Sequence, residues 1–232
     1  ASVANGVTEF LRPEDAHWDP SNPSDLYFVT TASFTGPSRL YKVSFTDILQ
    51  PELGGTIVAL LNGTEGQKMM DNMTVDNRGG VYIQEDPGNQ VHIAKLWKYD
   101  IGTDVLTQVG YADSARFITG APLFLTQDEE HSGIIDMEDI LGKGRYLFNV
   151  QAHYAIPGEL VEGGQILEFT TGDTLQPCVP PTIASITGAQ TICSTDTLEL
   201  AAAFNGTPGL GYSWSGTGSF LFGSGNASAL VT

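Results

Sequence analysis

The sequence is poor in basic residues and has no long hydrophobic run, and both shortages exclude whole classes of protein. Only 10 Lys and Arg stand against 27 Asp and Glu, which gives a formal net charge of −17, and none of the ten lies beyond Arg145. Without a basic patch to neutralise phosphates, nucleic acid is not an expected partner. Apolar runs such as 57–61 are far shorter than the roughly 20 residues that cross a bilayer, so we expect no membrane span.

Several catalytic signatures are also missing. The sequence contains no Gly-x-Ser-x-Gly elbow, Walker loop, HExxH or CxxC, so serine hydrolase, nucleotide hydrolase, zinc protease and thiol redox chemistry have no support. Residues 1–5 lack the basic and apolar regions of a signal peptide, so any such segment is expected to have been removed or to lie upstream. High acidity favours solubility in a saline exterior and makes calcium the natural counter-ion, and we expect a secreted or cell-surface protein.

Cysteine is scarce. Cys178 and Cys193 stand 15 positions apart, and a disulfide closing that loop would contribute roughly 3 kcal/mol in an oxidising compartment. The alternative is a pair of unlinked buried thiols.

What the sequence does have is turn residues. Its 27 Gly and 12 Pro, in a chain only 16% charged, favour many short strands over long helices and predict an all-β fold. Regularly spaced antiparallel strands admit a propeller or a sandwich. The expected strands are 26–31, 39–45, 56–61, 80–84, 95–100, 105–111, 145–152 and 165–170.

The texture changes near the C-terminal quarter. Residues 171–181 are rich in Pro and poor in charge, which predicts a linker between a domain at 1–170 and a second at 182–232. Cys193 and Trp214 resemble the Cys-to-Trp arrangement of immunoglobulin sandwiches. The segment has about 50 residues, which is half of the roughly 100 that a full sandwich takes. The segment resembles the PKD-like or Ig-like modules of secreted Bacteroidetes proteins, cut short.

The most informative stretch is 71–89, DNMTVDNRGGVYIQEDPGN. Gly79 and Gly80 supply a tight turn before a buried strand, and Glu85 and Asp86 follow that strand directly. Carboxylates at a strand end suit a hard cation. The densest acidic cluster, Asp128–Glu130, requires either a bound ion or full solvation, because adjacent carboxylates repel one another.

Four motifs carry a family resemblance: RPED (12–15), LYFVTT (26–31), DNMTVD (71–76) and QEDPGN (84–89). In this order they resemble the PhoX-type alkaline phosphatases, secreted β-propellers that hold calcium and iron in a central acidic site. The run from Gln127 to Asp136 before the strand 147–154 is similar to a late blade of that family. The resemblance spans roughly residues 8–170 and implies a β-propeller that hydrolyses phosphate monoesters with metal as Lewis acid.

The resemblance also implies site residues. Glu14 and Glu85 match metal-binding carboxylates, and Arg12 could meet a phosphate oxygen. Arg12 and Glu14 are thus the predicted catalytic residues, calcium and iron the implied metals, and a phosphate ester the implied substrate. The full set of predicted metal ligands is Glu14, Asp15, Glu85, Asp86, Asp128, Glu129 and Glu130.

Each of these residues has a structural alternative. Arg12 could simply pair with Glu14 or Asp15, and Asp71 and Asp76 are more typical of turn capping than of metal binding. His131 and His153 could ligate a metal, although His153 in a strand is more typical of packing. Gln84 departs from the family pattern, in which many members have Cys before the Glu-Asp pair.

The chain is short for a closed propeller, and this raises a second, non-enzymatic hypothesis. About 165 residues supply three or four blades of roughly 40 to 50 residues, where closure needs four to eight. We therefore expect a partial propeller that belongs to a longer parent chain. The competing hypothesis is a non-enzymatic surface assembly or adhesion protein whose domains are completed by neighbouring subunits.

Overall fold

The computed structural model describes residues 4, 6–158 and 161–172, and four strands beyond them at 182–187, 198–205, 220–222 and 228–231. The chain divides into two compact units, Ala1–Asp173 and Thr174–Thr232.

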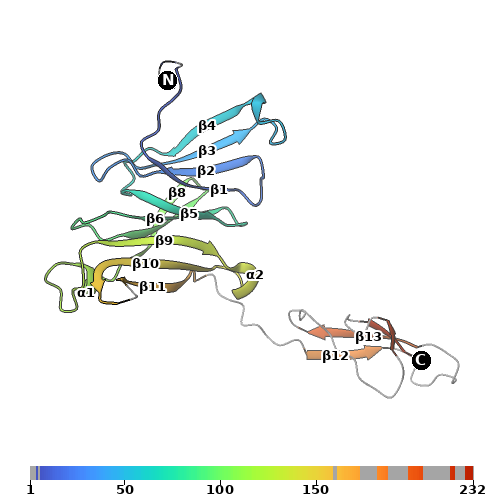
Figure 1. Ribbon diagram of the computed structural model, residues 1–232. Coiled ribbons are helices and arrows are strands. Elements are labelled where there is room, and N and C mark those ends of the chain that lie inside the picture. Colours follow the sequence, from blue (N-terminus) through green and yellow to red (C-terminus); the bar gives the residue numbers. More distant parts are fainter. Residues whose placement is uncertain are drawn as a thin grey trace. The chain divides into compact units, whose positions relative to one another are not determined.

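The first unit consists of three antiparallel sheets, each made from consecutive strands (Figure 1). The first sheet contains β1 (Pro13–Trp18), β2 (Asp25–Thr30), β3 (Arg39–Phe45) and β4 (Gly55–Leu61). The second contains β5 (Met70–Val75), β6 (Gly80–Glu85), β7 (Lys95–Asp100) and β8 (Val105–Tyr111). The third contains β9 (Glu129–Asp136), β10 (Arg145–Ile156) and β11 (Val161–Thr170). The helices are single turns: η2 (Pro51–Leu53), α1 (Ser114–Phe117) and α2 (Glu138–Leu141).

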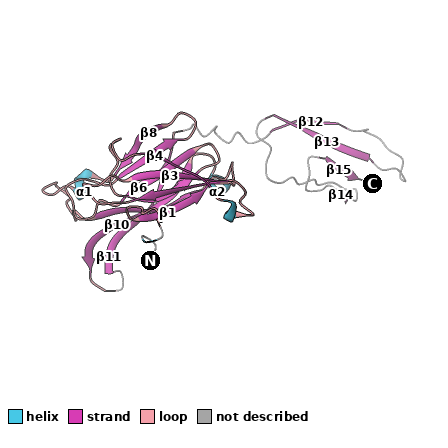
Figure 2. Ribbon diagram, turned by 90° about the horizontal axis from the view of Figure 1, so that it is seen from above, coloured by secondary structure: helices cyan, strands magenta, loops and turns pink. Residues whose placement is uncertain are grey.

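The three sheets are layered, with the second between the first and third (Figure 1), so that their strands overlap when seen from above (Figure 2). The first strand of each sheet lies beside the first strand of the next, so that β1 contacts β5 and β5 contacts β9. β1 and β5 run in the same direction, because Asp15 bonds Met73 near one end of β1 and Ser21 bonds Asn77 just past the other. β9 runs the same way, because Gly133 bonds Asn72 and, further along both segments, Glu138 pairs with Arg78. We call the ends at which β1, β5 and β9 begin the entry end, and the opposite ends the exit end.

The central sheet explains the two cores. Every residue of β6 is buried, as expected of a strand covered on both faces, and alternate side chains serve opposite layers. Val81 and Ile83 pack with residues of the first sheet. Tyr82 packs instead with Ile134 and Tyr146 of the third.

The β5–β6 turn forms as the Gly pair predicts. Gly79 has φ +84°, a left-handed conformation that disfavours residues with a Cβ. The Asp76 N–H donates to the Gly80 carbonyl at 2.9 Å and closes the turn. The Asp76 carboxylate accepts the N–H groups of Arg78 and Gly80, so this Asp does cap its own turn, as the structural alternative for it predicted.

The all-β prediction is confirmed, whereas a closed ring of sheets is not present among the described residues. The eight expected strands correspond to β2, β3, β4, β6, β7, β8, β10 and β11. The first strands of the three sheets, β1, β5 and β9, were not among the expected strands. None of the helices in the described part of the chain is long and apolar enough to span a membrane.

The second unit contains a four-stranded antiparallel sheet in the order β12-β13-β15-β14. Its strands are β12 (Thr182–Thr187), β13 (Leu198–Asn205), β14 (Phe220–Phe222) and β15 (Ser228–Val231). Cys178, Cys193 and Trp214 lie outside the described residues, as does the linker beyond Gly172.

Candidate functional site

Four carboxylates gather at the entry end of the first unit. Glu14, Asp71 and Glu130 each occupy the second position of a first strand, in β1, β5 and β9 respectively. Asp86 follows β6. Burial, and then the charges of Asp86, Glu14 and Glu130, raise the pKa of Asp71 to about 6. We call these four residues the entry-end cluster.

Cross-sheet hydrogen bonds hold the three first strands in this register. The Asp15 carboxylate of β1 accepts the Met73 N–H of β5 at 2.9 Å. On the other side of β5, the Asn72 side-chain oxygen accepts the Gly133 N–H of β9 at 3.0 Å. The strands therefore cannot slide without losing these bonds, and the equivalent second positions stay near one another.

Arg12 is a basic group beside the cluster. Its Nη2 lies 3.2 Å from Glu14 Oε1, and both side chains are largely exposed. Its backbone has φ +55°, which is unfavourable for a residue with a Cβ. The Thr31 N–H donates to the Arg12 carbonyl at 2.9 Å and holds the backbone there. The ion pair offered above as the structural alternative is therefore formed.

Glu85 has a different environment. Its side chain is 0% exposed, and its oxygens accept hydrogen bonds from the N–H groups of Lys68 and Lys95 and from Trp97 Nε1. His92 Nε2 lies 2.7 Å from the same carboxylate. Its acceptor capacity is thus used by donors of the chain, and Glu85 ties the loops before β5 and β7 to the end of β6.

Glu129 is buried with one oxygen unpaired. The residue is 1% exposed, and Oε1 accepts the Ala94 N–H at 2.9 Å, whereas Oε2 has no hydrogen-bond partner among the described residues. Burial raises the pKa of Glu129 to about 7, and the charge of neighbouring Asp128 adds to the rise. Burial and Asp86 likewise raise the pKa of Glu130.

The predicted ligands therefore divide into two groups. Glu14, Asp86 and Glu130 come together around Asp71, and Asp128 adds charge beside Glu130. The other three bond to N–H groups of the chain: Asp15, Glu85 and Glu129.

The two candidate histidines lie elsewhere. His131 is 3% exposed and packs edge-on against Phe148. Burial lowers the pKa of His131 to about 4, so its ring is neutral at pH 7. His153 Nδ1 lies 3.1 Å from Glu162 Oε2.

Asp71 is the functional candidate that sequence reasoning set aside as a turn residue. Its signal was its position, because PED, MDN and EEH place an acid second in each of three segments that the fold makes equivalent. The three segments have no other sequence similarity. Their common position becomes visible only once the fold shows that each is the first strand of a sheet.

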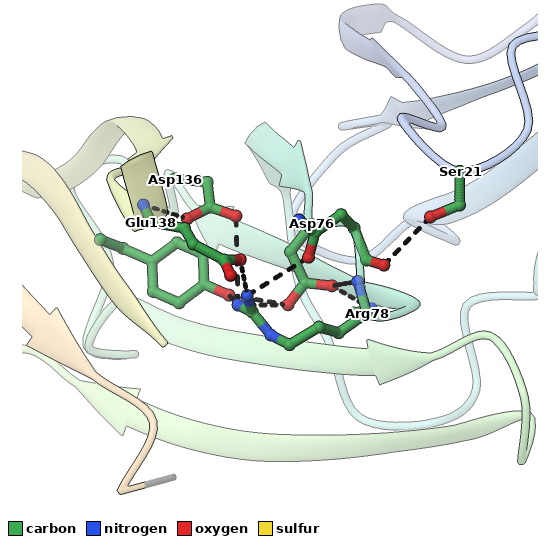
Figure 3. Close-up of polar contacts among 8 residues, drawn as sticks. Ser21, Asp76, Arg78, Asp136 and Glu138 are labelled. Carbon is green, nitrogen blue, oxygen red and sulfur yellow. Dashed lines mark hydrogen bonds and ion pairs between the residues drawn. The ribbon is translucent and has the colours of Figure 1, made fainter. Parts of the chain in front are cut away.

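The exit end of the same strands contrasts with this cluster (Figure 3). Arg78, in the β5–β6 turn, places Nη2 2.9 Å from Asp76 Oδ2 and donates from the same atom to Tyr146 Oη at 2.8 Å. Its Nη1 pairs with Glu138. The Asp136 carboxylate lies 4.0 Å away. One guanidinium therefore serves acids from two sheets.

Within the described ranges, no three His, Cys, Asp or Glu side chains are spaced as a ready-made metal site. Comparison of the chain with protein-family models, curated proteins and solved structures found no match.

Proposed function

We propose that the chain binds a divalent cation, with Ca²⁺ as the first candidate, at the entry-end cluster. The observation that carries the proposal is the equivalent placement of Glu14, Asp71 and Glu130 on three neighbouring first strands, joined by Asp86. Four carboxylates repel one another at neutral pH, and this repulsion adds to burial in raising the pKa of Asp71. A divalent cation would relieve that repulsion.

The donor set decides between metals. All four side chains offer carboxylate oxygens, which are hard ligands of the kind that Ca²⁺ prefers, and His131 and His153 lie elsewhere. The carboxylates are within electrostatic range without being at coordination spacing. A bound ion would therefore keep several water ligands, as Ca²⁺ tolerates in its flexible shell of six to eight oxygens. Iron would need a second, more tightly spaced set of ligands.

The proposal includes the scaffold. Successive antiparallel meanders with adjacent, co-directional first strands are what the inner strands of propeller blades would form, and the acids then face a common axis. This arrangement supports the resemblance to PhoX-type phosphatases and, with it, a secreted or cell-surface location.

Arg12 supports a phosphate-ester ligand for such a site. Its exposed guanidinium beside Glu14 could donate to a phosphoryl oxygen, while a cation held by the cluster neutralises charge on the same group. The left-handed backbone of Arg12 also supports a functional role, since strained residues concentrate at sites where a side chain must be held in one direction. When bound, the metal would supply Lewis acidity.

Calorimetric titration of CaCl₂ into chelator-treated protein tests the cation site. We expect one saturable event that Asp71→Asn weakens about tenfold or more, because one of four charges is lost. Glu52→Gln is the matched control, since Glu52 is exposed in η2 and outside the cluster. Equal affinity of Asp71→Asn and wild type would reject the entry-end site.

Turnover of an aryl phosphate tests the chemistry separately. Chelator-sensitive hydrolysis that Arg12→Ala reduces supports the phosphatase hypothesis. Calcium binding without hydrolysis, with or without added iron, would reject the phosphatase hypothesis and leave calcium binding as the function.

A further inference from the structure

The third sheet is one strand shorter than its neighbours. The first and second sheets each end in a fourth strand, β4 and β8, whereas the third ends at β11. In the part of the chain that the structure describes, β11 pairs with β10 on one side and with no strand on the other. An unpaired edge is a template for another strand.

The register shows which backbone groups lie on that edge. Thr171 N–H donates to the Gly144 carbonyl at 2.9 Å, directly beyond the paired Arg145 and Thr170. Because antiparallel residues alternate between bonding to one neighbour and facing the other side, odd-numbered β11 residues bond β10. Gly164, Ile166 and Glu168 therefore direct their N–H and C=O groups to the open edge.

A cavity of about 460 Å³ adjoins this edge. It lies among β8, α1, β10 and β11, and β10 contributes alternate side chains from one face, Phe148, Val150, Ala152 and Tyr154. From β11, however, residues 164, 165 and 167–169 all line it. A single face of a strand cannot supply such near-consecutive residues, so the edge backbone of β11 is itself part of the wall.

We propose that β11 accepts an extended segment of another polypeptide as a fourth strand, with an apolar side chain of that segment entering the cavity. Main-chain bonds to Gly164, Ile166 and Glu168 would provide affinity, and the cavity would select the side chain. This surface is independent of the proposed cation site, since β11 carries none of the entry-end carboxylates.

The net charge of the chain and the sequence of β8 indicate what kind of segment β11 would accept. Two copies of a chain with a formal charge of −17 repel each other, which favours a neutral or basic partner over a second copy. The fourth strand of the adjacent sheet, β8, has the sequence VLTQVGY, with aliphatic residues and few charges. A segment of this kind suits an edge beside an apolar cavity.

The probe is a fluorescent peptide with the β8 sequence, VLTQVGY, flanked by lysines and titrated with the full chain in chelator. We expect saturable anisotropy, and slower hydrogen exchange of the Gly164, Ile166 and Glu168 amides when peptide is present. Ile166→Pro removes an outward N–H without removing a β10 bond, and we expect it to weaken binding about tenfold or more. Ile166→Thr keeps the N–H and serves as control.

A second variant keeps the test decisive if the proline substitution unfolds the sheet. Ala152→Leu fills part of the cavity from β10 and should weaken the peptide without touching the edge. No binding to wild type, or equal binding to wild type and both folded variants, would overturn the proposal. Binding retained by both of two peptides, one N-methylated at the odd amides and the other at the even amides, would also overturn it, since one of the two must lose its N–H bonds to β11.

Discussion

The acidic side chains at the two ends of β1, β5 and β9 differ in whether the fold supplies a counter-charge for them. At the exit end, the guanidinium of Arg78 reaches Asp76, Asp136 and Glu138 (Figure 3), and one of these acids, Asp76, is 1% exposed. At the entry end, Arg12 pairs with Glu14 at the surface, and the pKa of Asp71 is nevertheless raised to about 6. One end carries its counter-charge within the fold, whereas the other is left with excess negative charge.

This difference indicates which end depends on the solvent. Acids that meet a fixed guanidinium need no external ion, and their contribution is structural. Acids that remain under mutual repulsion lower stability until a proton or a cation joins them. The comparison therefore predicts opposite responses when charge is removed from the two ends.

The largest effect is expected at the exit end. Arg78→Met should lower the free energy of unfolding by about 3 kcal/mol, because it leaves the buried Asp76 carboxylate without its cation. Denaturant unfolding measures the loss. Lys143→Met removes the same charge from an exposed position and should change little. A loss no larger than that control would mean that Arg78 is not the internal counter-charge.

Next in size is Glu129, buried near the entry end. Its folded pKa of about 7 lies above the ordinary value of 4.5, so the cost of its charge is full above pH 7 and is relieved as the pH falls from about 7 toward 4.5. Glu129→Gln should therefore be more stable than wild type by about 2 kcal/mol at pH 8. Below pH 6.5, His131 takes up a proton in the unfolded state, because its folded pKa is only about 4. This lowers the stability of both proteins. Thermal unfolding between pH 8 and 6.5 should show the difference narrowing, and a constant difference would contradict the assignment.

Tyr146 sharpens the comparison at the exit end. Its hydroxyl donates to Asp76 at 2.8 Å and accepts from Arg78. Tyr146→Phe should lower the free energy of unfolding by about 1.5 kcal/mol, because a buried hydrogen-bonded hydroxyl is lost. Tyr111→Phe, at a position 62% exposed, is the control for the same chemical change. An unchanged midpoint for Tyr146→Phe would show that the Tyr146 hydroxyl contributes nothing to holding Asp76.

The smallest effect concerns Asp71. In chelator at pH 8, Asp71→Asn should raise the free energy of unfolding by about 0.5 to 1 kcal/mol, after discounting the pKa shift for partial exposure. The gain should fade as pH falls through about 6 toward 4, where wild-type Asp71 takes up its proton. Destabilisation at pH 8 would instead give Asp71 a structural role like that of Asp76.

The strands that sequence reasoning located and those it missed differ in composition. The segments 39–45, 95–100 and 105–111 combine aromatic or branched residues with flanking turns, and β3, β7 and β8 have these bounds. The segments that form β1, β5 and β9 contain Asp, Glu and Asn, which have low strand propensity, and they read as loops. Tertiary pairing against β2, β6 and β10 overrides that preference.

The same gap limited the site prediction. Glu14, Asp86 and Glu130 were predicted from motifs and clustering, but the local sequence does not separate them from Glu85 and Glu129, which adjoin two of them. Side-chain direction separates them, because neighbouring strand residues face opposite sides. Glu85 turns to Trp97 and His92, and Glu129 to Ala94.

The meander order of the first unit has a consequence for how the molecule could be taken apart. No described strand in this unit forms a backbone ladder with a strand of a different sheet, and the intervening segments 62–69 and 112–128 contain no strand. A nick within 112–128 would sever no ladder, and side-chain hydrogen bonds and ion pairs between the sheets, such as Asn72 to Gly133 and Arg78 to Glu138, would hold the pieces together with the packed faces. Separately expressed halves should recombine, making the chain a natural candidate for split-fragment reconstitution.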